Sequence, residues 1–459
     1  MNSSDSTASD ARSWPTSTTS KSATARGPTL NDLEAVKGKK PVIAWGLYDW
    51  ANSAFATTVM AAFFPVFFKE YWSAGTNAEQ STFQLGLANS LGSLVVVLLA
   101  PLLGAIADQG GTRRKFLFAF AFLGILATGC LYLVAEGQWV LAICVYVLAA
   151  VGFSGANTFY DALLVEVADR NRADFISALG YSLGYLGGGL LFAINVAMVL
   201  NPASFGLADA TQAVRVCFVM VALWWAIFSV PLLLWVEETA PAHSKRGWQA
   251  FAAGYRQLAA TFREIRQLRS ALIFLVGYWL YIDGVDTIVR MAVDYGMSLG
   301  FATDHLLLAL GITQFVGVPA AIAFGKIGER IGTRKGLFIG LAAYVGATIW
   351  AYTIEETWEF YLLAAAVGLV QGGVQALSRS LYARLIPRDR AAEFFGFYNM
   401  LGKFAAVIGP TLMGWVAVLT GSPRFGILSI ILLFIAGGLC LYFVDEEEGE
   451  RAARAMEAG

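Results

Sequence analysis

Long runs of apolar residues recur along this chain and are separated by short polar stretches. Each run covers about twenty residues, which is the length that an α-helix needs to cross the roughly 30 Å hydrocarbon layer of a bilayer. The runs do not alternate apolar and polar positions, as the strands of a membrane β-barrel do. The pattern therefore predicts an all-α integral membrane protein.

Twelve transmembrane helices are predicted in two sets of six. They cover residues 43–68, 84–106, 116–135, 139–163, 176–199 and 214–236, and then 271–294, 304–324, 336–354, 358–383, 394–419 and 424–444. An even number of spans places both termini on one side of the membrane. Most of the 32 lysines and arginines fall in the tails and loops of that side, as is typical of cytoplasmic segments. We expect both termini in the cytoplasm, with the protein in a bacterial inner membrane, or in a vacuolar membrane if the source is eukaryotic.

The segments outside the spans suggest the domain organisation. Residues 1–41 are rich in Ser, Thr and Ala and are expected to form a disordered cytoplasmic tail. The six-helix halves cover 42–237 and 271–444. The linker at 238–270 carries apolar residues at helical spacing, which predicts an amphipathic helix on the membrane surface. Residues 445–459 form a second cytoplasmic tail.

The amino-acid composition and the absence of certain motifs argue against other classes of protein. Hydrophobic residues make up 57% of the chain and charged residues 14%, against roughly 45–50% and about 25% in soluble domains. The four cysteines are scattered singly and lack metal-binding spacing. No phosphate-binding lysine motif and no cluster of His, Cys or Ser with a base is found in the sequence. We therefore expect no enzyme activity, metal, cofactor or nucleic-acid partner.

The chain also contains an internal duplication. Similar loops follow the second and the eighth predicted helix, with a small residue, an acid, a glycine and paired bases at equal offsets. The two sets are Gly104, Asp108, Gly111, Arg113 and Arg114, and Gly325, Glu329, Gly332, Arg334 and Lys335. A second match pairs residues 169–173 with 387–391 at an offset of 218. The repeats predict two six-helix pseudo-repeats in parallel orientation, with these loops acting as gates on the cytoplasmic side.

These loops resemble the signature loop of the major facilitator superfamily. A narrower resemblance, to the autophagy-related vacuolar effluxer branch and its uncharacterised bacterial relatives, rests on residues 47–55, 280–284 and 375–380. The resemblance implies a twelve-helix transporter that works by alternating access, with the first, fourth, seventh and tenth helices lining a central cavity. Fungal members of the branch are associated with the export of amino acids from the vacuole.

Polar residues inside the spans are expected to face the protein interior, because a charge facing lipid costs several kcal/mol. They fall on the first, fourth, seventh, tenth and eleventh helices, and many are grouped at helical spacing. The candidate substrate or proton ligands are Asp49, Asn52, Asn157, Tyr160, Asp161, Asp283, Asp286, Arg290, Gln375, Arg379, Asn399 and Lys403. Both signs of charge, with amides and hydroxyls, favour a small polar or zwitterionic solute.

Structural alternatives exist for several of these residues. Arg290 can pair with Asp286 or Asp294 within its own helix, and Arg379 or Lys403 can balance Asp49 or Asp161 without touching a substrate. Asp161 lies near the cytoplasmic end of its helix and can belong to a gate. Among the carboxylates, Asp283 is the first candidate for the group that carries a coupling proton, and Asp49 is the second.

The sequence thus predicts a monomeric secondary transporter for an amino acid or related metabolite, with proton-coupled efflux as the first hypothesis. Import of the same solutes is the nearest alternative. A membrane receptor that does not transport is an alternative of a different class.

Overall fold

The computed structural model describes residues 39–75, 78–239, 248–264, 268–404 and 408–458, and it contains helices but no strand within those ranges. Among the described residues, ten helices are long and apolar enough to cross a membrane, and two shorter apolar helical segments cover Leu94–Gly110 and Ile408–Thr420. Together these correspond to the twelve predicted spans, so the all-α fold with two six-helix halves is confirmed.

The first half begins with α1 (Lys39–Ala54), which continues through η2 (Phe55–Phe63), α2 (Phe64–Phe67) and η3 (Phe68–Trp72). The other helices of this half are α3 (Ala78–Gly110), α4 (Arg113–Cys130) with η4 (Leu131–Leu133), α5 (Trp139–Ala162) with α6 (Leu164–Val167), α7 (Ala173–Leu200), η5 (Pro202–Phe205) and α8 (Ala210–Trp235).

The second half follows the linker helix α9 (Trp248–Glu264). Its helices are α10 (Arg269–Ser298), α11 (Thr303–Ile331), α12 (Thr333–Thr353), α13 (Thr357–Leu385), η7 (Arg388–Arg390), α14 (Ala391–Phe404), α15 (Ile408–Thr420), α16 (Pro423–Ser429) and α17 (Ile431–Tyr442), and α18 (Glu446–Ala458) ends the chain.

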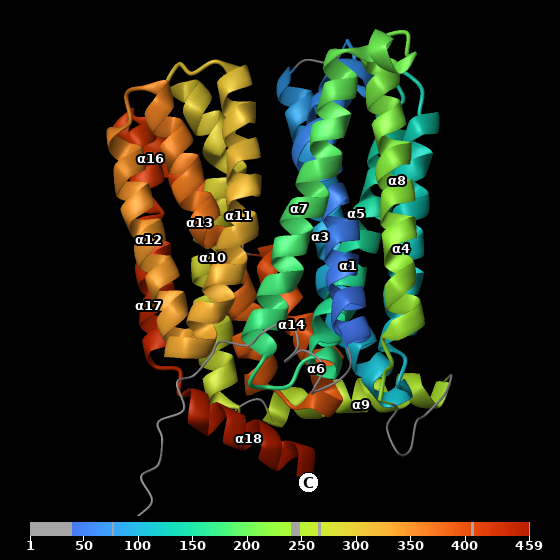
Figure 1. The fold of residues 1–459 in the computed structure, drawn as a ribbon, viewed down its shortest axis with the longest axis vertical. Coiled ribbons are helices and arrows are strands. Elements are labelled where there is room, and N and C mark those ends of the chain that lie inside the picture. The colour runs from blue at the N-terminus through green and yellow to red at the C-terminus, as the bar shows by residue number, and fades with distance from the viewer. Residues whose placement is uncertain (1–38, 76–77, 240–247, 265–267, 405–407, 459) are drawn as a thin grey trace, which may run out of the picture.

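Figure 1 shows the two halves side by side, with the start of α1, the linker helix α9 and α18 at one end of the bundle. We call this end the terminal face. The halves meet along two seams, α3 against α14 and α7 against α11. The ribbons of α7 and α11 lie close together near the terminal face and diverge toward the opposite face (Figure 1). The molecule is therefore closed at the terminal face.

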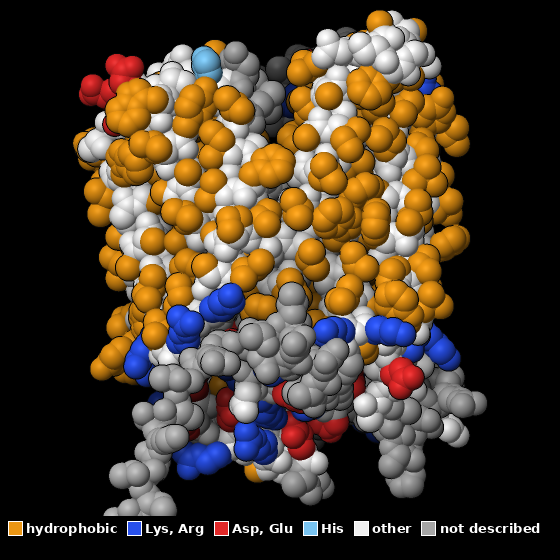
Figure 2. Space-filling model, in the orientation of Figure 1, with side chains coloured by type: hydrophobic (Ala, Val, Ile, Leu, Met, Phe, Trp, Pro, Cys, Tyr) orange, Lys and Arg blue, Asp and Glu red, His pale blue; other side chains and the backbone are white. Residues whose placement is uncertain are grey.

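The outer surface suits a lipid environment. Figure 2 shows hydrophobic side chains over the visible face of both halves, with charged side chains gathered near the terminal face. Individual apolar side chains are strongly exposed, among them Val418 at 81% and Leu98 at 67%. A soluble protein rarely exposes a continuous apolar surface of this extent.

Several element boundaries differ from the predictions. The first helix starts at Lys39, inside the predicted tail, and contains π-helical turns, whereas the rest of that tail, 1–38, lies outside the described residues. The second helix starts at Ala78 rather than near 84. Residues 445–459, predicted as a second cytoplasmic tail, contain α18. The amphipathic helix expected in the linker corresponds to α9, in which Gly254 packs directly on the backbone of Ile106 in α3.

Candidate functional site

The centre of the bundle holds a buried cluster around the guanidinium of Arg379 on α13. Its Nη1 donates to Asp161 Oδ1 at 3.1 Å and lies 3.8 Å from Asp49 Oδ2. Its Nε and Nη2 donate to the hydroxyl and carbonyl oxygens of Ser177, each at 2.9 Å. Asn399 donates to Asp161 Oδ2 at 3.0 Å. Arg379 and Asn399 come from the second half and the other three residues from the first. This central cluster therefore joins the two halves.

Aromatic rings enclose the same guanidinium. Its carbon lies 4.3 Å from the ring centre of Tyr181, 4.7 Å from that of Trp45 and 5.4 Å from that of Tyr160. The Tyr160 hydroxyl also donates to Asp49 Oδ2 at 3.2 Å. Arg379 is only 2% exposed, so its charge must be compensated by partners, and cation–π contacts add to the two carboxylates. The cluster contains two carboxylates for one guanidinium.

The central ion pair lies where the two pseudo-repeats meet. Asp161 and Arg379 are 218 positions apart, which is the offset that aligns residues 169–173 with 387–391. Asn399 and Tyr181 are separated by the same offset, and each contacts one member of the pair. Equivalent residues of two repeats can touch only close to the axis that relates the repeats. The sequence contained this signal, although the predictions did not use it.

A second polar contact lies one helical turn away on α1. Asn52 donates to Asn157 Oδ1 of α5 at 2.5 Å, and Ser53 donates to Asp49 at 3.4 Å. Both contacts stay within the first half. The predicted stripe of Asp49, Asn52 and Ser53 therefore faces α5 and the central cluster.

Asp283 lies apart from the central cluster. Both of its carboxylate oxygens accept from the backbone N–H of Gly409 at 3.0 Å, and Thr287 donates to it at 3.4 Å. Gly409 lies on α15, so this carboxylate joins α10 to α15. The side chain is fully buried. Asp283 thus holds α15 against α10.

Asp286 and Arg290 occupy more open positions on α10. They form an i,i+4 ion pair at 3.8 Å, and their side chains are 26% and 53% exposed. Arg290 lies close enough to Tyr146 of the other half for a Coulombic interaction. Gln375 is half-buried on α13, one turn before Arg379. Lys403 lies on α14, and its side chain falls outside what the structure describes.

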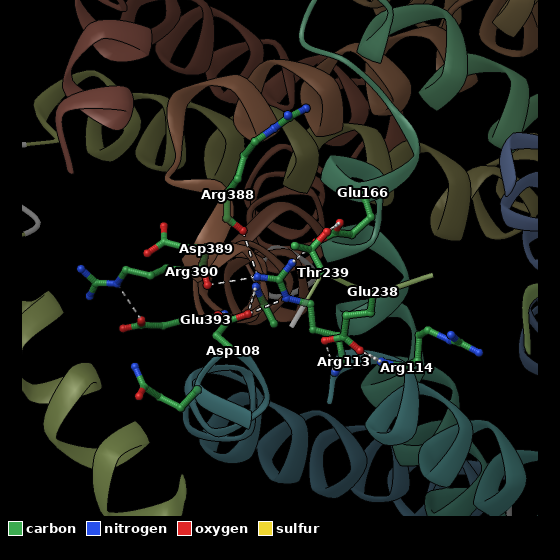
Figure 3. Close-up of polar contacts among 12 residues, drawn as sticks. Asp108, Arg113, Arg114, Glu166, Glu238, Thr239, Arg388, Asp389, Arg390 and Glu393 are labelled. Carbon is green, nitrogen blue, oxygen red and sulfur yellow. Dashed lines mark hydrogen bonds and ion pairs between the residues drawn. The ribbon is translucent and has the colours of Figure 1, made fainter. Parts of the chain in front are cut away.

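The predicted gate loop after α3 forms a lock at the terminal face (Figure 3). Asp108 accepts from Arg113 Nε at 2.6 Å and from the backbone N–H groups of Ala392 and Glu393 at 3.1 and 2.8 Å. Those N–H groups are at the start of α14, where the helix dipole favours a negative charge. Arg113 Nη2 also donates to the carbonyl oxygens of Arg388 and Asp389, at 2.9 and 3.1 Å. We call these contacts across the α3–α14 seam the terminal lock.

The remaining motif residues shape this loop. Glu238 accepts from the backbone N–H groups of Arg113 and Arg114 at 2.8 and 3.1 Å and so caps α4. Gly111 has a φ of 57°, which suits glycine best. A Cβ added at Gly104 would lie 2.2 Å from the Ala392 carbonyl oxygen. The small residue is therefore required for the close approach of α3 and α14.

The repeated loop after α11 does not form the same contacts. Glu329 makes no hydrogen bond or ion pair with any residue that the structure describes. Asp174 of α7 instead accepts from Thr333 at 2.6 Å and from Ser380, and it lies 3.4 Å from Arg384 Nη2. Asp174 belongs to the first half and these partners to the second. The α7–α11 side is therefore held by a carboxylate that the motif comparison did not identify.

The other motif positions of this second loop keep a local role. The backbone N–H of Arg334 donates to Glu446 at 3.2 Å, and its Nη1 contacts the Val444 carbonyl oxygen. Lys335 is exposed, and Gly332 has a φ of 94°. A Cβ added at Gly325 would lie 2.6 Å from that of Ala178 on α7. Gly325 therefore serves close packing, as Gly104 does in the first loop.

The site also contains residues that the sequence analysis missed. Ser177, Trp45 and Tyr181 contact Arg379 directly but were not among the predicted ligands. No charge marks these positions in the sequence. Tyr181 could have been found from the repeat offset, because it is the counterpart of Asn399.

Comparison with known proteins identifies the family. A family model described as "Vacuole effluxer Atg22 like" matches residues 165–454, and one described as "Major Facilitator Superfamily" matches residues 10–192. An uncharacterized MFS-type transporter, YxiO, of Bacillus subtilis is 39% identical over 88% of this chain and 94% of its own length. Autophagy-related protein 22 of Yarrowia lipolytica is 24% identical over 80% of this chain and 76% of its own length.

Solved structures with the same fold are also transporters. The human organic anion transporter MFSD10 aligns with a TM-score of 0.67 at 14% identity, covering 88% of this chain and 99% of the other. The proton:xylose symporter XylE aligns with a TM-score of 0.65 at 14% identity, covering 91% and 97%. These relatives and neighbours are transporters rather than enzymes. The chain therefore belongs to the Atg22-like vacuole effluxer family of the major facilitator superfamily and is a membrane transporter.

Proposed function

We propose that this transporter exports an amino acid or a related zwitterionic metabolite, that protons drive the export, and that its terminal face is cytoplasmic. The observation that carries the proposal is the central cluster, in which two carboxylates of one half share a single guanidinium of the other. The cluster bridges the halves, so any change in its charge alters the stability of the closed terminal face.

The charge of the central cluster supports proton coupling. Asp49, Asp161 and Arg379 carry a net charge of minus one when all three are ionised. Burying an uncompensated charge costs several kcal/mol, so the cluster favours the uptake of one proton or the binding of a cationic group. Asp49 is the more weakly paired carboxylate, since it lies 3.8 Å from the guanidinium and Asp161 lies at 3.1 Å. We assign the coupling proton to Asp49, and Asp283 is the second candidate.

The α10 pair supports a zwitterionic substrate. Asp286 is partly exposed and Arg290 is exposed, and their opposite charges suit an ammonium and a carboxylate group. Asp286 also lies within Coulombic range of Tyr185 and Tyr344, whose buried hydroxyls have no hydrogen-bond partner among the described residues. Unpaired buried hydroxyls are costly, and a polar ligand would satisfy them. We assign the substrate site to this region between the halves.

The comparisons support export as the direction of transport and protons as the coupling ion. The family model names an effluxer, and two solved neighbours are named as proton symporters of xylose and fucose. Import of the same solutes uses the same alternating access and is the alternative. A receptor that only binds would need neither an excess carboxylate between the halves nor a lock that bridges them.

Substitution of Asp49 tests the coupling assignment. Asp49→Asn keeps the Asp161–Arg379 pair but removes the excess negative charge. In proteoliposomes, we expect this variant to exchange a labelled amino acid between equal pools within roughly threefold of the parent rate, because the Asp161–Arg379 pair that bridges the halves remains. A threefold change in rate corresponds to less than about 1 kcal/mol. Accumulation driven by a pH gradient should be lost.

Both measurements are made on one reconstituted sample, after a screen of labelled amino acids, sugars and organic anions. Glu70→Gln, which changes an exposed carboxylate in the same way, serves as the control. If Asp49→Asn still accumulates substrate, Asp49 is not the coupling group, and Asp283→Asn is measured next. If no solute exchanges even with the parent, the transport proposal for these substrate classes is wrong.

Site-directed labelling tests the orientation. In a background without the four native cysteines, a cysteine at exposed Asn171 near the terminal face should be shielded from an impermeant thiol reagent in intact cells. A cysteine at exposed Ser204, in η5 on the opposite face, should react. Permeabilised cells should show equal labelling at both sites. Labelling of position 171 in intact cells would reverse the proposed orientation.

A further inference from the structure

The C-terminal helix α18 lies across the terminal face (Figure 1). Glu446, Glu450 and Glu457 occur at spacings of four and seven residues, so they lie along one face of the helix. Gly449 and Ala453, on the same face, are buried. The acidic residues of its first turn also suit a helix N-terminus. One side of α18 is therefore packed against the bundle and carries a row of carboxylates.

The first contacts of this row are with the second half. Glu446 Oε1 accepts from the backbone N–H of Arg334 at 3.2 Å. The Arg384 side chain lies 3.9 Å from Glu446 Oε2 and 3.8 Å from Glu450 Oε1. Arg384 is the same side chain that lies 3.4 Å from Asp174 of the first half. The helix thus holds an arginine that reaches across the α7–α11 side.

The last carboxylate of the row contacts both halves directly. Glu457 Oε1 accepts from Arg170 Nη2 of the first half at 2.8 Å and from the backbone N–H of Arg388 of the second half at 2.9 Å. Arg170 and Arg388 occupy equivalent repeat positions, and each also donates to a backbone carbonyl oxygen of the other half. One carboxylate oxygen therefore ties together two loops that must separate when the terminal face opens.

We propose that α18 is a strap that stabilises the closed terminal face and that its release favours opening of this face. The strap acts through two connections, Glu457 between Arg170 and Arg388, and Glu446 with Glu450 on Arg384. It does not involve the central cluster or any substrate. Its role is therefore independent of the cargo, the coupling ion and the direction of transport.

The test measures the conformational equilibrium rather than transport. Spin labels replace exposed Lys115 and Lys335, one in each half near the terminal face, in the full chain without native cysteines. A second pair at exposed Ser204 and Glu355 reports the opposite face. In Glu457→Arg, and in a chain that ends after Asp445, we expect the short-distance population of the first pair to fall. The closed-to-open ratio should fall roughly two- to tenfold, since partly exposed ion pairs are individually weak.

The matched control is Glu448→Arg, which makes the same charge change at an exposed position of the same helix. It should leave both distance distributions unchanged. A double-mutant cycle of Arg170→Gln and Glu457→Gln should be non-additive, because the two side chains share one interaction. Distances equal to the parent in both Glu457→Arg and the shortened chain, or an additive cycle, would overturn the proposal. Normal membrane levels of each variant exclude a folding defect.

Discussion

Replacing Arg379 by glutamine is expected to reduce substrate counterflow by at least about a hundredfold. Removing one partner of a buried ion pair costs about 3–5 kcal/mol, and every 1.4 kcal/mol is a factor of about ten. The change leaves Asp49 and Asp161 buried without their counter-ion. It also removes two hydrogen bonds to Ser177. The state closed at the terminal face, which depends on this bridge, should become rare.

Two further variants make the result specific. Arg379→Lys keeps the charge but not the planar fork that reaches Ser177 and Asp161 together, so it should recover only part of the activity. Lys69→Gln removes a positive charge from an exposed position in η3 and should transport normally. Counterflow in proteoliposomes, with purified amounts matched, provides the measurement. Transport by Arg379→Gln at the parental rate would show that the central cluster does not control alternation.

Gly104→Ala should prevent tight closure of the terminal face and abolish most transport. The added Cβ would lie 2.2 Å from the carbonyl oxygen of Ala392 and 2.8 Å from the Cα of Glu393, both in the backbone of α14. A backbone cannot move aside as a flexible side chain can, and overpacking of this kind costs about 1–3 kcal/mol or more. The separation of α3 and α14 would also weaken the contact between Asp108 and the start of α14.

Gly346→Ala on α12 is the matched control, because a Cβ there meets nothing within 4 Å. In a helix, this change by itself stabilises by roughly 0.5–1 kcal/mol, so any loss in Gly104→Ala comes from contact rather than from helix propensity. Spin-label distances across the terminal face should lengthen in Gly104→Ala and stay unchanged in Gly346→Ala. A closed face and normal transport in Gly104→Ala would refute the packing argument.

The spans and the signature loop around Asp108 could be predicted from the sequence because each depends on residues near one another in the chain, whereas the partners of Asp108 in α14 lie 284 and 285 positions away and were not predicted. Hydrophobic length marks a span, and fixed spacing marks the repeated loop. The pairing of Arg379 with Asp161 needed tertiary information, although the repeat offset of 218 would have indicated it. The match between the two signature loops, at an offset of 221, gave no warning that Glu329 lacks the contacts of Asp108.

Asp283 illustrates a different limit of the sequence. A carboxylate in the middle of an apolar helix can bind a proton, bind a substrate or accept a hydrogen bond from the backbone of another helix, and the residue types around it are the same in each case. The contact with Gly409 joins residues that are 126 positions apart in the chain, and the local pattern of neither predicted span indicates it. Contacts of this kind are visible only once the backbone is placed.

The two sets of charges at the terminal face differ in their access to water. Asp108 and Arg113 of the terminal lock have side chains that are 1% and 5% exposed, whereas Arg170 and Glu457 of the strap are 13% and 28% exposed. Dissolved ions screen exposed charges over about 8 Å at physiological ionic strength but affect buried pairs far less. Rising salt should therefore loosen the strap while the lock persists, which makes the ionic strength of the adjoining compartment a control on how readily this face opens.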